Sequence, residues 1–312
     1  MARFDVVVIG DANPDLLFRG GDVVPAFGQH EHIVEEARLM VGGSGAIMAC
    51  GAARLGLRTA FVGLLGDDPF GRFMADALGE RDVDVSACRV DPTRPTGVTV
   101  VLSRAEDRAM LTALGTIAAL RGEDVDLDLL TDSRHVHVSS YYLQEGLQPD
   151  LPALFDKAHR AGATTSIDPN WDPNERWDAG LLDLLWLTDY FMPNSAEARA
   201  ITGIDDIDVA TESLSERGTT LAVKFGQGGG LAKAGDELVH VEAVPVDVVD
   251  TTGAGDSFDA GFLAGRLKGW PIERCLQLAV ACGSLSTRAA GGITAQPTLD
   301  EAIAAVEGLE AT

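Results

Sequence analysis

The 312-residue chain is acidic, with 48 Asp and Glu residues against 24 Lys and Arg residues and a formal net charge of −24. Its hydrophobic content of 46% and charged content of 23% are those of a globular protein, which excludes global disorder. Because nucleic acids and anionic membranes bind basic surfaces, we expect neither as a partner. The length favours a single α/β domain over residues 1–312 with a small appendage.

Cysteine usage and the start of the chain bear on localisation. The four cysteines show no Cys-x-x-Cys pattern and no paired spacing, which predicts reduced thiols and neither zinc nor disulfides: Cys50, Cys88, Cys275 and Cys282. The chain enters a strand at Phe4 without a signal-peptide pattern, and no run of about 18 uncharged apolar residues follows. We therefore expect a cytoplasmic protein without a transmembrane helix.

The first predicted element is a buried strand over residues 4–10, followed by a turn at 11–15. Polar side chains at such a strand end stand where α/β proteins bind ligands, so Asn13 and Asp15 are candidate substrate ligands. Capping or turning the chain is the commoner use of these residue types and is the alternative.

Two regions interrupt the alternation of strands and helices, at about 12–40 and 93–116. The first is broken up by glycines and a proline, and the second contains two apolar runs, 97–102 and 108–114, with the spacing of a β-hairpin. We assign both regions to a small β-sheet that projects from the main domain. A surface hairpin without a role in catalysis is the alternative.

A glycine pair, Gly42 and Gly43, precedes a helix of small residues that extends to Gly56. A dinucleotide-binding motif requires Gly-x-Gly-x-x-Gly directly after a strand, and Gly43-Ser-Gly45 lacks the third glycine at that spacing. The pattern therefore does not indicate a Rossmann-type site.

The rest of the chain continues the alternation of strands and helices. Tyr141 and Tyr142 fall at the end of a strand predicted over 135–142 and suit a sugar pocket, although core packing is the commoner use of such a pair. Asn194 and Glu197 have the spacing of a capping box at a helix start. The alternation predicts a three-layer αβα sandwich with a mostly parallel central sheet.

The stretch from Val248 to Gly265 carries the strongest chemical signal. The β-branched residues at 244–249 predict a strand, residues 250–252 a turn, and the small residues after them a helix start. The N–H groups of 253–255 at such a helix start attract anions, and Asp256 beside them would stay ionised and accept a proton. This pattern indicates phosphoryl transfer to a hydroxyl; an ordinary N-capped helix is the alternative.

Asp-Thr-Thr-Gly-Ala-Gly-Asp at 250–256, followed by Ser-Phe and by Ala-Gly-Phe at 260–262, closely resembles the C-terminal signature of the ribokinase-like (PfkB) carbohydrate kinases. Residues 41–56 resemble the first signature of that family, and Asn194-x-x-Glu197 and Lys224-x-Gly226 follow in the family's order. The resemblance implies a ribokinase-like fold with a β-sheet lid and ATP-dependent phosphorylation of a sugar hydroxyl. It gives Asp256 the role of catalytic base and gives the amides of Gly253, Ala254 and Gly255 the role of anion hole.

The patterns and the resemblance together give a set of candidate site residues. Substrate binding is expected at Asn13, Asp15, Gly42, Gly43, Tyr142, Asp168 and Asn170. Nucleotide binding is expected at Asn194, Lys224, Gly226, Gly229, Thr252, Val280 and Gly283. The resemblance further implies Mg²⁺ ordered through water by Glu197 and Asn194, K⁺ at Asp250 and Thr252, and a homodimer formed through the lid.

Two departures from the family pattern bear on the substrate. Ile47 replaces an Asn whose amide contacts sugar hydroxyls in relatives, which points to a substrate with fewer hydroxyls there. Asp172 stands where several acid-sugar kinases have an Arg, and its charge would repel a sugar acid such as 2-keto-3-deoxygluconate. We therefore expect a small neutral sugar. A nucleoside kinase, which Ile47 and Tyr142 would suit, and a non-catalytic sugar- or nucleotide-binding regulator are the alternatives.

Overall fold

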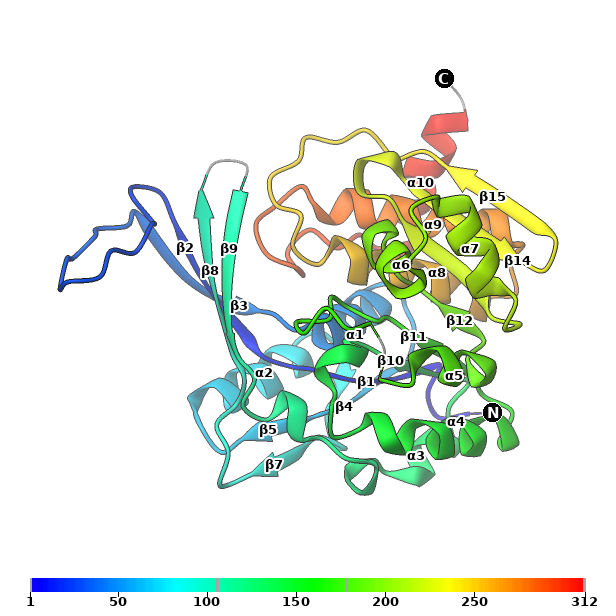
Figure 1. The fold of residues 1–312 in the computed structure, drawn as a ribbon, viewed down its shortest axis with the longest axis horizontal. Coiled ribbons are helices and arrows are strands. Elements are labelled where there is room, and N and C mark those ends of the chain that lie inside the picture. The colour runs from blue at the N-terminus through cyan, green and yellow to red at the C-terminus, as the bar shows by residue number, and fades with distance from the viewer. Residues whose placement is uncertain (1, 105–106, 178, 311–312) are drawn as a thin grey trace.

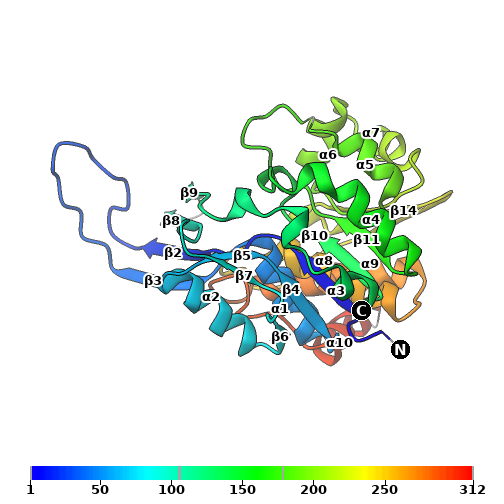
Figure 2. The ribbon, with the colours of Figure 1, turned by 90° about the horizontal axis from the view of Figure 1, so that it is seen from below.

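The central sheet is built from short apolar strands that are buried on both faces. The computed structural model describes residues 2–104, 107–177 and 179–310, and within these ranges a nine-stranded sheet lies between two layers of helices (Figures 1 and 2). Along its first strand, Val6 and Val8 face one core and Val7 and Ile9 face the other. Strands covered on both faces are typical of α/β proteins, and the expected αβα sandwich is confirmed.

The strands of this sheet are β1 (Val6–Ile9), β4 (Thr59–Val62), β6 (Val83–Asp84), β10 (His135–Val138), β11 (Thr164–Ile167), β12 (Tyr190–Phe191), β13 (Thr220–Lys224), β14 (Gly230–Ala234) and β15 (Glu237–Val241). Their spatial order is β15-β14-β13-β12-β11-β10-β1-β4-β6. All neighbours from β6 to β13 are parallel, and β14 and β15 extend the sheet as antiparallel strands. The carboxyl ends of the parallel strands therefore meet at one edge.

Helices cover the two faces in separate groups. One core contains residues of α1 (Ser44–Arg54), α2 (Pro69–Gly79), α8 (Ala254–Leu267), α9 (Ile272–Ser286) and α10 (Leu299–Glu310). The other contains residues of α3 (Leu127–Thr131), α4 (Leu151–Arg160), α5 (Leu181–Leu184), α6 (Ser195–Thr202) and α7 (Ile207–Ser215). No helix among the residues described is long and apolar enough to cross a membrane.

A four-stranded sheet projects from the sandwich and forms the lid (Figure 1). Its order is β3 (Glu36–Val41), β2 (Pro14–Arg19), β8 (Val98–Arg104) and β9 (Asp107–Ala113). The predicted hairpin is confirmed, since β8 and β9 pair antiparallel from Val98↔Ala113 to Arg104↔Asp107. A separate pair, β5 (Leu64–Gly66) and β7 (Arg89–Asp91), lies near its base.

The prediction of a strand over residues 244–249 is wrong. This segment follows β15 as an extended chain that pairs with no strand in the described part of the molecule. Pro245 has no N–H to donate, and neighbouring donors bond to α9 and the residue after it instead: Val244 N to Ser284 Oγ at 3.2 Å, and Val249 N to Thr287 O at 2.8 Å. The apolar side chains line a cleft rather than a sheet.

The strand predicted over 135–142 is also shorter than expected. β10 ends at Val138, Ser140 has a left-handed backbone with φ of 54°, and Tyr141–Leu143 forms a 3-10 turn. The tyrosine pair therefore lies beyond the end of the strand and does not continue its direction.

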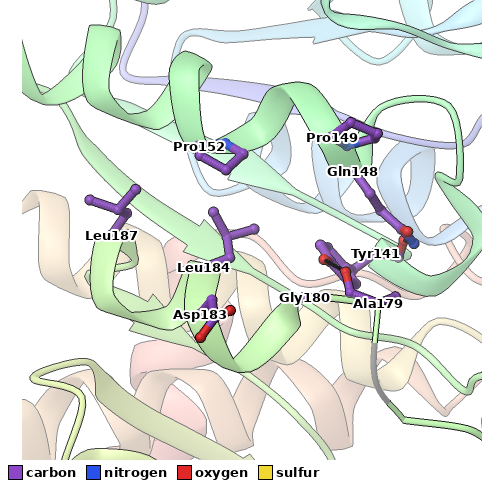
Figure 3. Close-up of a pocket in the computed structure, with 9 residues that line it drawn as sticks. All are labelled: Tyr141, Gln148, Pro149, Pro152, Ala179, Gly180, Asp183, Leu184 and Leu187. Carbon is purple, nitrogen blue, oxygen red and sulfur yellow. Dashed lines mark hydrogen bonds between the residues drawn. The ribbon is translucent and has the colours of Figure 1, made fainter.

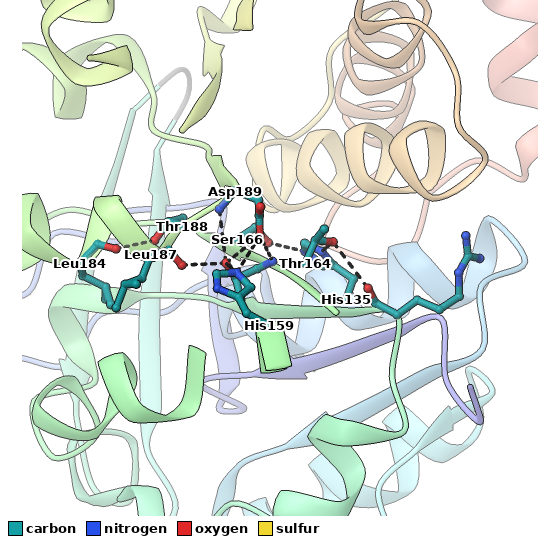
Figure 4. A network of polar contacts seen from close by, with 10 residues as sticks. His135, His159, Thr164, Ser166, Leu184, Leu187, Thr188 and Asp189 are labelled. Atoms are coloured by element: carbon teal, nitrogen blue, oxygen red, sulfur yellow. Dashed lines mark hydrogen bonds and ion pairs between the residues drawn. The ribbon is translucent and has the colours of Figure 1, made fainter. Parts of the chain in front are cut away.

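Two buried histidines of β10, His135 and His137, contact side chains of β11, and Figure 4 shows His135 beside Thr164 and Ser166. The His135 ring lies 2.7 Å from both Thr164 Oγ1 and Ser166 Oγ, and His137 Nδ1 lies 2.7 Å from the same Ser166 oxygen. Burial lowers the pKa of His135 well below its usual range and that of His137 to about 3. Both rings are therefore neutral near neutral pH.

Candidate active site

The loops at the carboxyl edge of the parallel strands enclose a cleft of about 870 Å³. The turn before α8, the start of α6, the end of β13 and the lid strand β9 all contribute to its lining. The residues predicted for the site that line it are Asp168, Asn170, Asn194, Glu197, Lys224, Gly226, Gly229, Gly253, Ala254, Gly255, Asp256, Val280 and Gly283. Segments far apart in the sequence are thus brought to one place.

The start of α8 has the features of an anion-binding site. Gly253 precedes the helix with a φ of 73°, and no side chain caps its first turn. A Cβ at Gly253 would lie 2.7 Å from Gly292 Cα and 2.8 Å from Ile47 Cγ2, so only glycine fits. The helix start therefore presents backbone N–H groups to the cleft without a competing side-chain acceptor.

Asp256 lies in this first turn, and its Oδ1 accepts a hydrogen bond of 2.5 Å from Ser44 Oγ at the start of α1. Burial raises the pKa of Asp256 to about 7 and the Asp168 carboxylate adds to the rise, whereas the Ser44 hydroxyl and the Lys224 ammonium oppose it. The expected full ionisation by the helix terminus is thus outweighed by the surroundings. A carboxylate with this pKa is better matched to accepting a proton near neutral pH than an exposed one.

Lys224 lies deeper than expected for a phosphate ligand. Its Nζ contacts Asp168 Oδ2 and lies 3.0 and 3.1 Å from the two carboxylate oxygens of Asp259. Burial would lower the pKa of Lys224, but the carboxylates of Asp168, Asp259 and Glu197 raise it above its usual value. The lysine is a charged member of a buried network.

Three residues of this site were missed in the sequence: Asp259, Ser44 and Asp11. Asp259 stands three residues after Asp256, and residues so spaced in a helix share a face. Ser44 lies inside the glycine signature, and Asp11 directly follows the buried run of β1. These positions in the sequence are the features from which the three residues could have been predicted.

The N-terminal candidates lie together beside Ser44. Asp11 accepts hydrogen bonds from the backbone of Ser44 and Gly45, and Asn13 Nδ2 donates to Thr99 Oγ1 of the lid at 3.2 Å. Burial raises the pKa of Asp15 to about 7, with Asp11 adding to the rise. These carboxylates suit the hydroxyl groups of a sugar.

The glycine pair leaves room for these side chains. A Cβ at Gly42 would lie 2.1 Å from Asp15 Oδ1, and one at Gly43, whose φ is 81°, would lie 2.8 Å from Asp11 O. Both positions therefore require glycine.

Three residues invoked for substrate choice do not face the cleft. Tyr142 is 4% exposed and packs edge-on against Tyr141 and Trp177. Ile47 is buried beneath Gly253 and Gly292. Asp172 is 4% exposed and accepts hydrogen bonds from the backbone of Asn174, Arg176 and Trp177, so it orders its own loop.

Asn194 and Glu197 form the expected capping box at the start of α6. Asn194 Oδ1 accepts from Glu197 N at 2.9 Å, and Glu197 Oε2 accepts from Asn194 N at 2.8 Å. Burial raises the pKa of Glu197 to about 7, and Asp168 adds to the rise while Lys224 opposes it. Both side chains line the cleft, and their oxygens are the ligand type that Mg²⁺ prefers, so the residues fit a hydrated Mg²⁺.

The turn before α8 is joined to the lid. Asp250 accepts hydrogen bonds from Thr252 N and Oγ1 and from Gly291 N. Arg108 of β9 lines the cleft, donates to Thr252 Oγ1 at 2.9 Å and lies 3.8 Å from Asp250 Oδ1. A lid side chain therefore reaches the turn that leads to the anion-binding amides.

One part of the cleft lining is apolar. It consists of glycines and the side chains of Val244, Val246, Phe258 and Val280. Gly229 has a φ of 83°, and a Cβ there would lie 2.0 Å from Val241 O. Such an apolar slot next to an anion-binding helix start suits the base of a nucleotide.

A second cavity, of about 440 Å³, lies between α4 and α5 (Figure 3). Its lining includes two leucines and two prolines, and Tyr141 Oη donates to Ala179 O at 2.6 Å at one end. Tyr141, one of the two tyrosines expected to suit a sugar pocket, lines this cavity instead of the cleft.

Known carbohydrate kinases resemble this chain over nearly its whole length. The model of the pfkB family of carbohydrate kinases matches residues 3–299. A fructokinase from Klebsiella pneumoniae is 36% identical, over 94% of this chain and 96% of that protein. The structure of Arabidopsis thaliana ribokinase complexed with ribose and ATP has a TM-score of 0.84 at 26% identity, covering 98% of this chain and 99% of that one. An Escherichia coli structure with ATP and Mg²⁺ has a TM-score of 0.86 at 27% identity, covering 97% and 99%.

Proposed function

The chain belongs to the pfkB family of carbohydrate kinases and is an ATP-dependent sugar kinase, and we propose that it phosphorylates a hydroxyl of a small neutral sugar with Asp256 as general base. The observation that carries this proposal is the placement of the Asp256 carboxylate, held by Ser44, in the uncapped first turn of α8. A proton acceptor and an anion-binding helix start are thus adjacent.

In the proposed reaction, Asp256 accepts the proton of the sugar hydroxyl as its oxygen attacks the γ-phosphorus of ATP. The new O–P bond forms in line with the bond to the bridging oxygen, which breaks and leaves on ADP. The amides of Gly253, Ala254 and Gly255 stabilise the negative charge on the transferring group. Mg²⁺, held through Asn194 and Glu197, would neutralise charge on the phosphates.

The carboxylates around the proposed sugar site favour a neutral sugar as the phosphate acceptor. Asp11, Asp15 and Asp256 lie around the start of α1, and carboxylates there accept hydrogen bonds from sugar hydroxyls but repel an anionic substrate. Asp172 does not supply this repulsion, because it is turned into its own loop. The 36% identity to a fructokinase makes fructose the first sugar to test.

The two alternatives have less support from the structure. A nucleoside kinase was favoured by Ile47 and Tyr142, and both are buried away from the cleft. A non-catalytic regulator would be expected to lose the base or the anion-binding amides, and this chain retains both.

K⁺ at Asp250 and Thr252 is the less well supported part of the proposal. The Asp250 carboxylate already accepts from Thr252 and Gly291 and faces the guanidinium of Arg108. A bound K⁺ would compete with that arginine. Sugar-dependent ADP formation measured with K⁺ or with an inert organic cation at equal ionic strength tests it, and equal rates would exclude a requirement.

A panel of ligands tests the substrate assignment. Thermal unfolding is measured with fructose, ribose, gluconate and adenosine, each with and without Mg²⁺ and a non-hydrolysable ATP analogue, and ADP formation is followed for the ligands that stabilise the protein. Fructose is expected to stabilise the protein and to be phosphorylated. Stabilisation and turnover with adenosine or gluconate alone would overturn the neutral-sugar assignment.

The lid supports the proposed homodimer. One row across its sheet consists of Leu39, Leu16, Val100 and Leu111, which pair in register, and the next row on that face includes Phe18 and Leu102. Leu39 and Leu111 are 42% and 63% exposed. Asp15 and Thr99 are on the opposite face, toward the cleft, so the apolar face is left for a second copy.

Light scattering at micromolar concentration checks the homodimer. Wild type is expected to show twice the mass of Leu111→Asp, because a charge on the apolar face of the lid opposes association. A monomeric wild type would contradict the proposal.

We also propose a cytoplasmic enzyme, supported by four cysteines that form no disulfide in this structure.

A further inference from the structure

Lys224 occupies the centre of a buried network beneath the helix start that carries Asp256. Its side chain is 11% exposed, and those of its partners Asp168 and Asp259 are 8% and 1% exposed. An ammonium group has three N–H donors, and Asp168 Oδ2 and the two oxygens of Asp259 supply three acceptors. The N–H donors of Lys224 are thus directed to carboxylates, and a phosphate would have to compete with them.

The charge balance of the network depends on the Lys224 ammonium group. Oxygen atoms of Asp168, Asp256 and Asp259 lie within 4.8 Å of one another. Carboxylates this close do not all ionise without a compensating positive charge, and Lys224 Nζ lies among them. The lysine is therefore a counter-ion built into the floor of the cleft.

The geometry points to Lys224 as a positioning residue: it ties the ends of β11 and β13 to α8 and supplies the positive charge that keeps Asp256 able to accept a proton, instead of binding a phosphate of ATP. This inference rests on the proposed role of Asp256 as the base. It replaces the expectation that Lys224 contacts the nucleotide.

Charged groups from several elements surround Asp256, and their signs determine whether a substitution favours its protonated or its ionised form. Removal of Lys224 leaves carboxylates as the main neighbours and favours the protonated form of Asp256, whereas neutralising Asp168 favours the ionised form. The charged groups in and beneath the cleft are Asp11 after β1, Arg108 on β9, Asp168 after β11, Glu197 on α6, Lys224 on β13 and Asp259 on α8.

Lys224→Met, which keeps the length of the side chain without its charge, tests this role. The dissociation constant of a non-hydrolysable ATP analogue is measured by calorimetry, and kcat is measured from pH 5.5 to 9. We expect the dissociation constant to change by less than about threefold, while the acid limb of kcat moves up by about one pH unit. A dissociation constant raised by about tenfold or more with the acid limb unmoved would overturn the inference.

Asp168→Asn provides a second, opposite readout. It removes the carboxylate whose charge raises the pKa of Asp256 and keeps Lys224, so the acid limb is expected to move to lower pH; an unmoved limb would overturn the inference even where Lys224→Met does not fold. The double variant Lys224→Met/Asp168→Asn is expected to return the limb toward wild type. Failure of the proposed function is distinguishable, because it would appear as wild-type turnover in Asp256→Asn.

Discussion

Ser44 is the residue whose removal reports on the charge of Asp256 with the least disturbance. Its hydroxyl donates to Asp256 Oδ1 and thereby stabilises the carboxylate against burial and the Asp168 charge. In Ser44→Ala the pKa of Asp256 is expected to rise further, so activity lost at pH 7 is regained at higher pH. The acid limb of kcat should move up by about one pH unit, and Ser44→Thr, which keeps the hydroxyl, should move it less. An acid limb that stays in place would contradict this contact.

Gly253 and Gly255 give a matched pair of single substitutions at the anion-binding turn. Alanine at 253 must adopt a φ of 73° and meets Gly292 and Ile47 below 3 Å, whereas a Cβ at 255 lies 3.4 Å from Lys224 Cδ. Gly253→Ala is expected to lower the free energy of unfolding by about 1–3 kcal/mol in urea titrations, and Gly255→Ala by much less. Equal losses would show that the backbone at 253 is not constrained.

Individual site residues were predictable where a local sequence pattern, such as a helix start, fixes their place on the backbone. Asp256 at a helix start and the Asn194–Glu197 capping box are local patterns of this kind. The direction of a side chain depends on packing from distant segments, so the burial of Ile47 under Gly292 and the pairing of Lys224 with Asp259 were not predictable from spacing.

Among the elements, the lid hairpin has the clearest contact with the site. Arg108 on β9 reaches Thr252 and Asp250 from across the cleft. Arg108→Ala is expected to raise the KM for the sugar about three- to tenfold by weakening the closed lid, since one such contact is worth about 1 kcal/mol. Arg104→Ala, an exposed arginine on the same hairpin, is the control. An equal rise in both variants would contradict a specific contact.

Element prediction succeeded where the apolar pattern and the backbone hydrogen bonds agree. The β8–β9 hairpin has two runs of suitable length with a short connection, and it formed as predicted. The run at 244–249 has the residue types of a strand, but Pro245 lacks an N–H, and the N–H groups of Val244 and Val249 donate to acceptors on Ser284 and Thr287. β-propensity without a partner strand did not determine the structure.

For the whole molecule, the buried histidines predict how stability depends on pH. The folded-state pKa of His137 is about 3 against an ordinary value of 6.5, so below pH 6.5 the unfolded chain binds a proton that the folded chain does not. Folding stability is therefore lost as pH falls. Between pH 6.5 and 5, wild type should lose about 2 kcal/mol of unfolding free energy relative to His137→Gln.

Urea titrations across this pH range measure the difference, and His240→Gln, at an exposed position on β15, is the control. The comparison must be between variants, because Asp15, Glu197 and Asp256 have raised pKa values and act in the opposite direction as pH falls from 7. Parallel pH profiles for wild type and His137→Gln would contradict the neutral buried ring.

The sandwich as a whole was predictable because alternating apolar strands and helices permit few arrangements. The site was less predictable, because its cleft is assembled from the segments after β11, β12, β13 and β15 and from a lid whose contacts the sequence pattern does not give. Contacts between distant segments bring Asp168 and Asp259 to the same lysine, Lys224, and the local spacing of these residues in the sequence does not predict this.

Turnover of Asp256→Asn measures the central claim most directly. The substitution keeps the shape of the side chain and removes the proton acceptor, so kcat with the best sugar is expected to fall by about 10²- to 10⁴-fold while binding of an ATP analogue and the unfolding temperature stay close to wild type. Turnover near that of wild type at pH 7 would remove Asp256 from the chemical step.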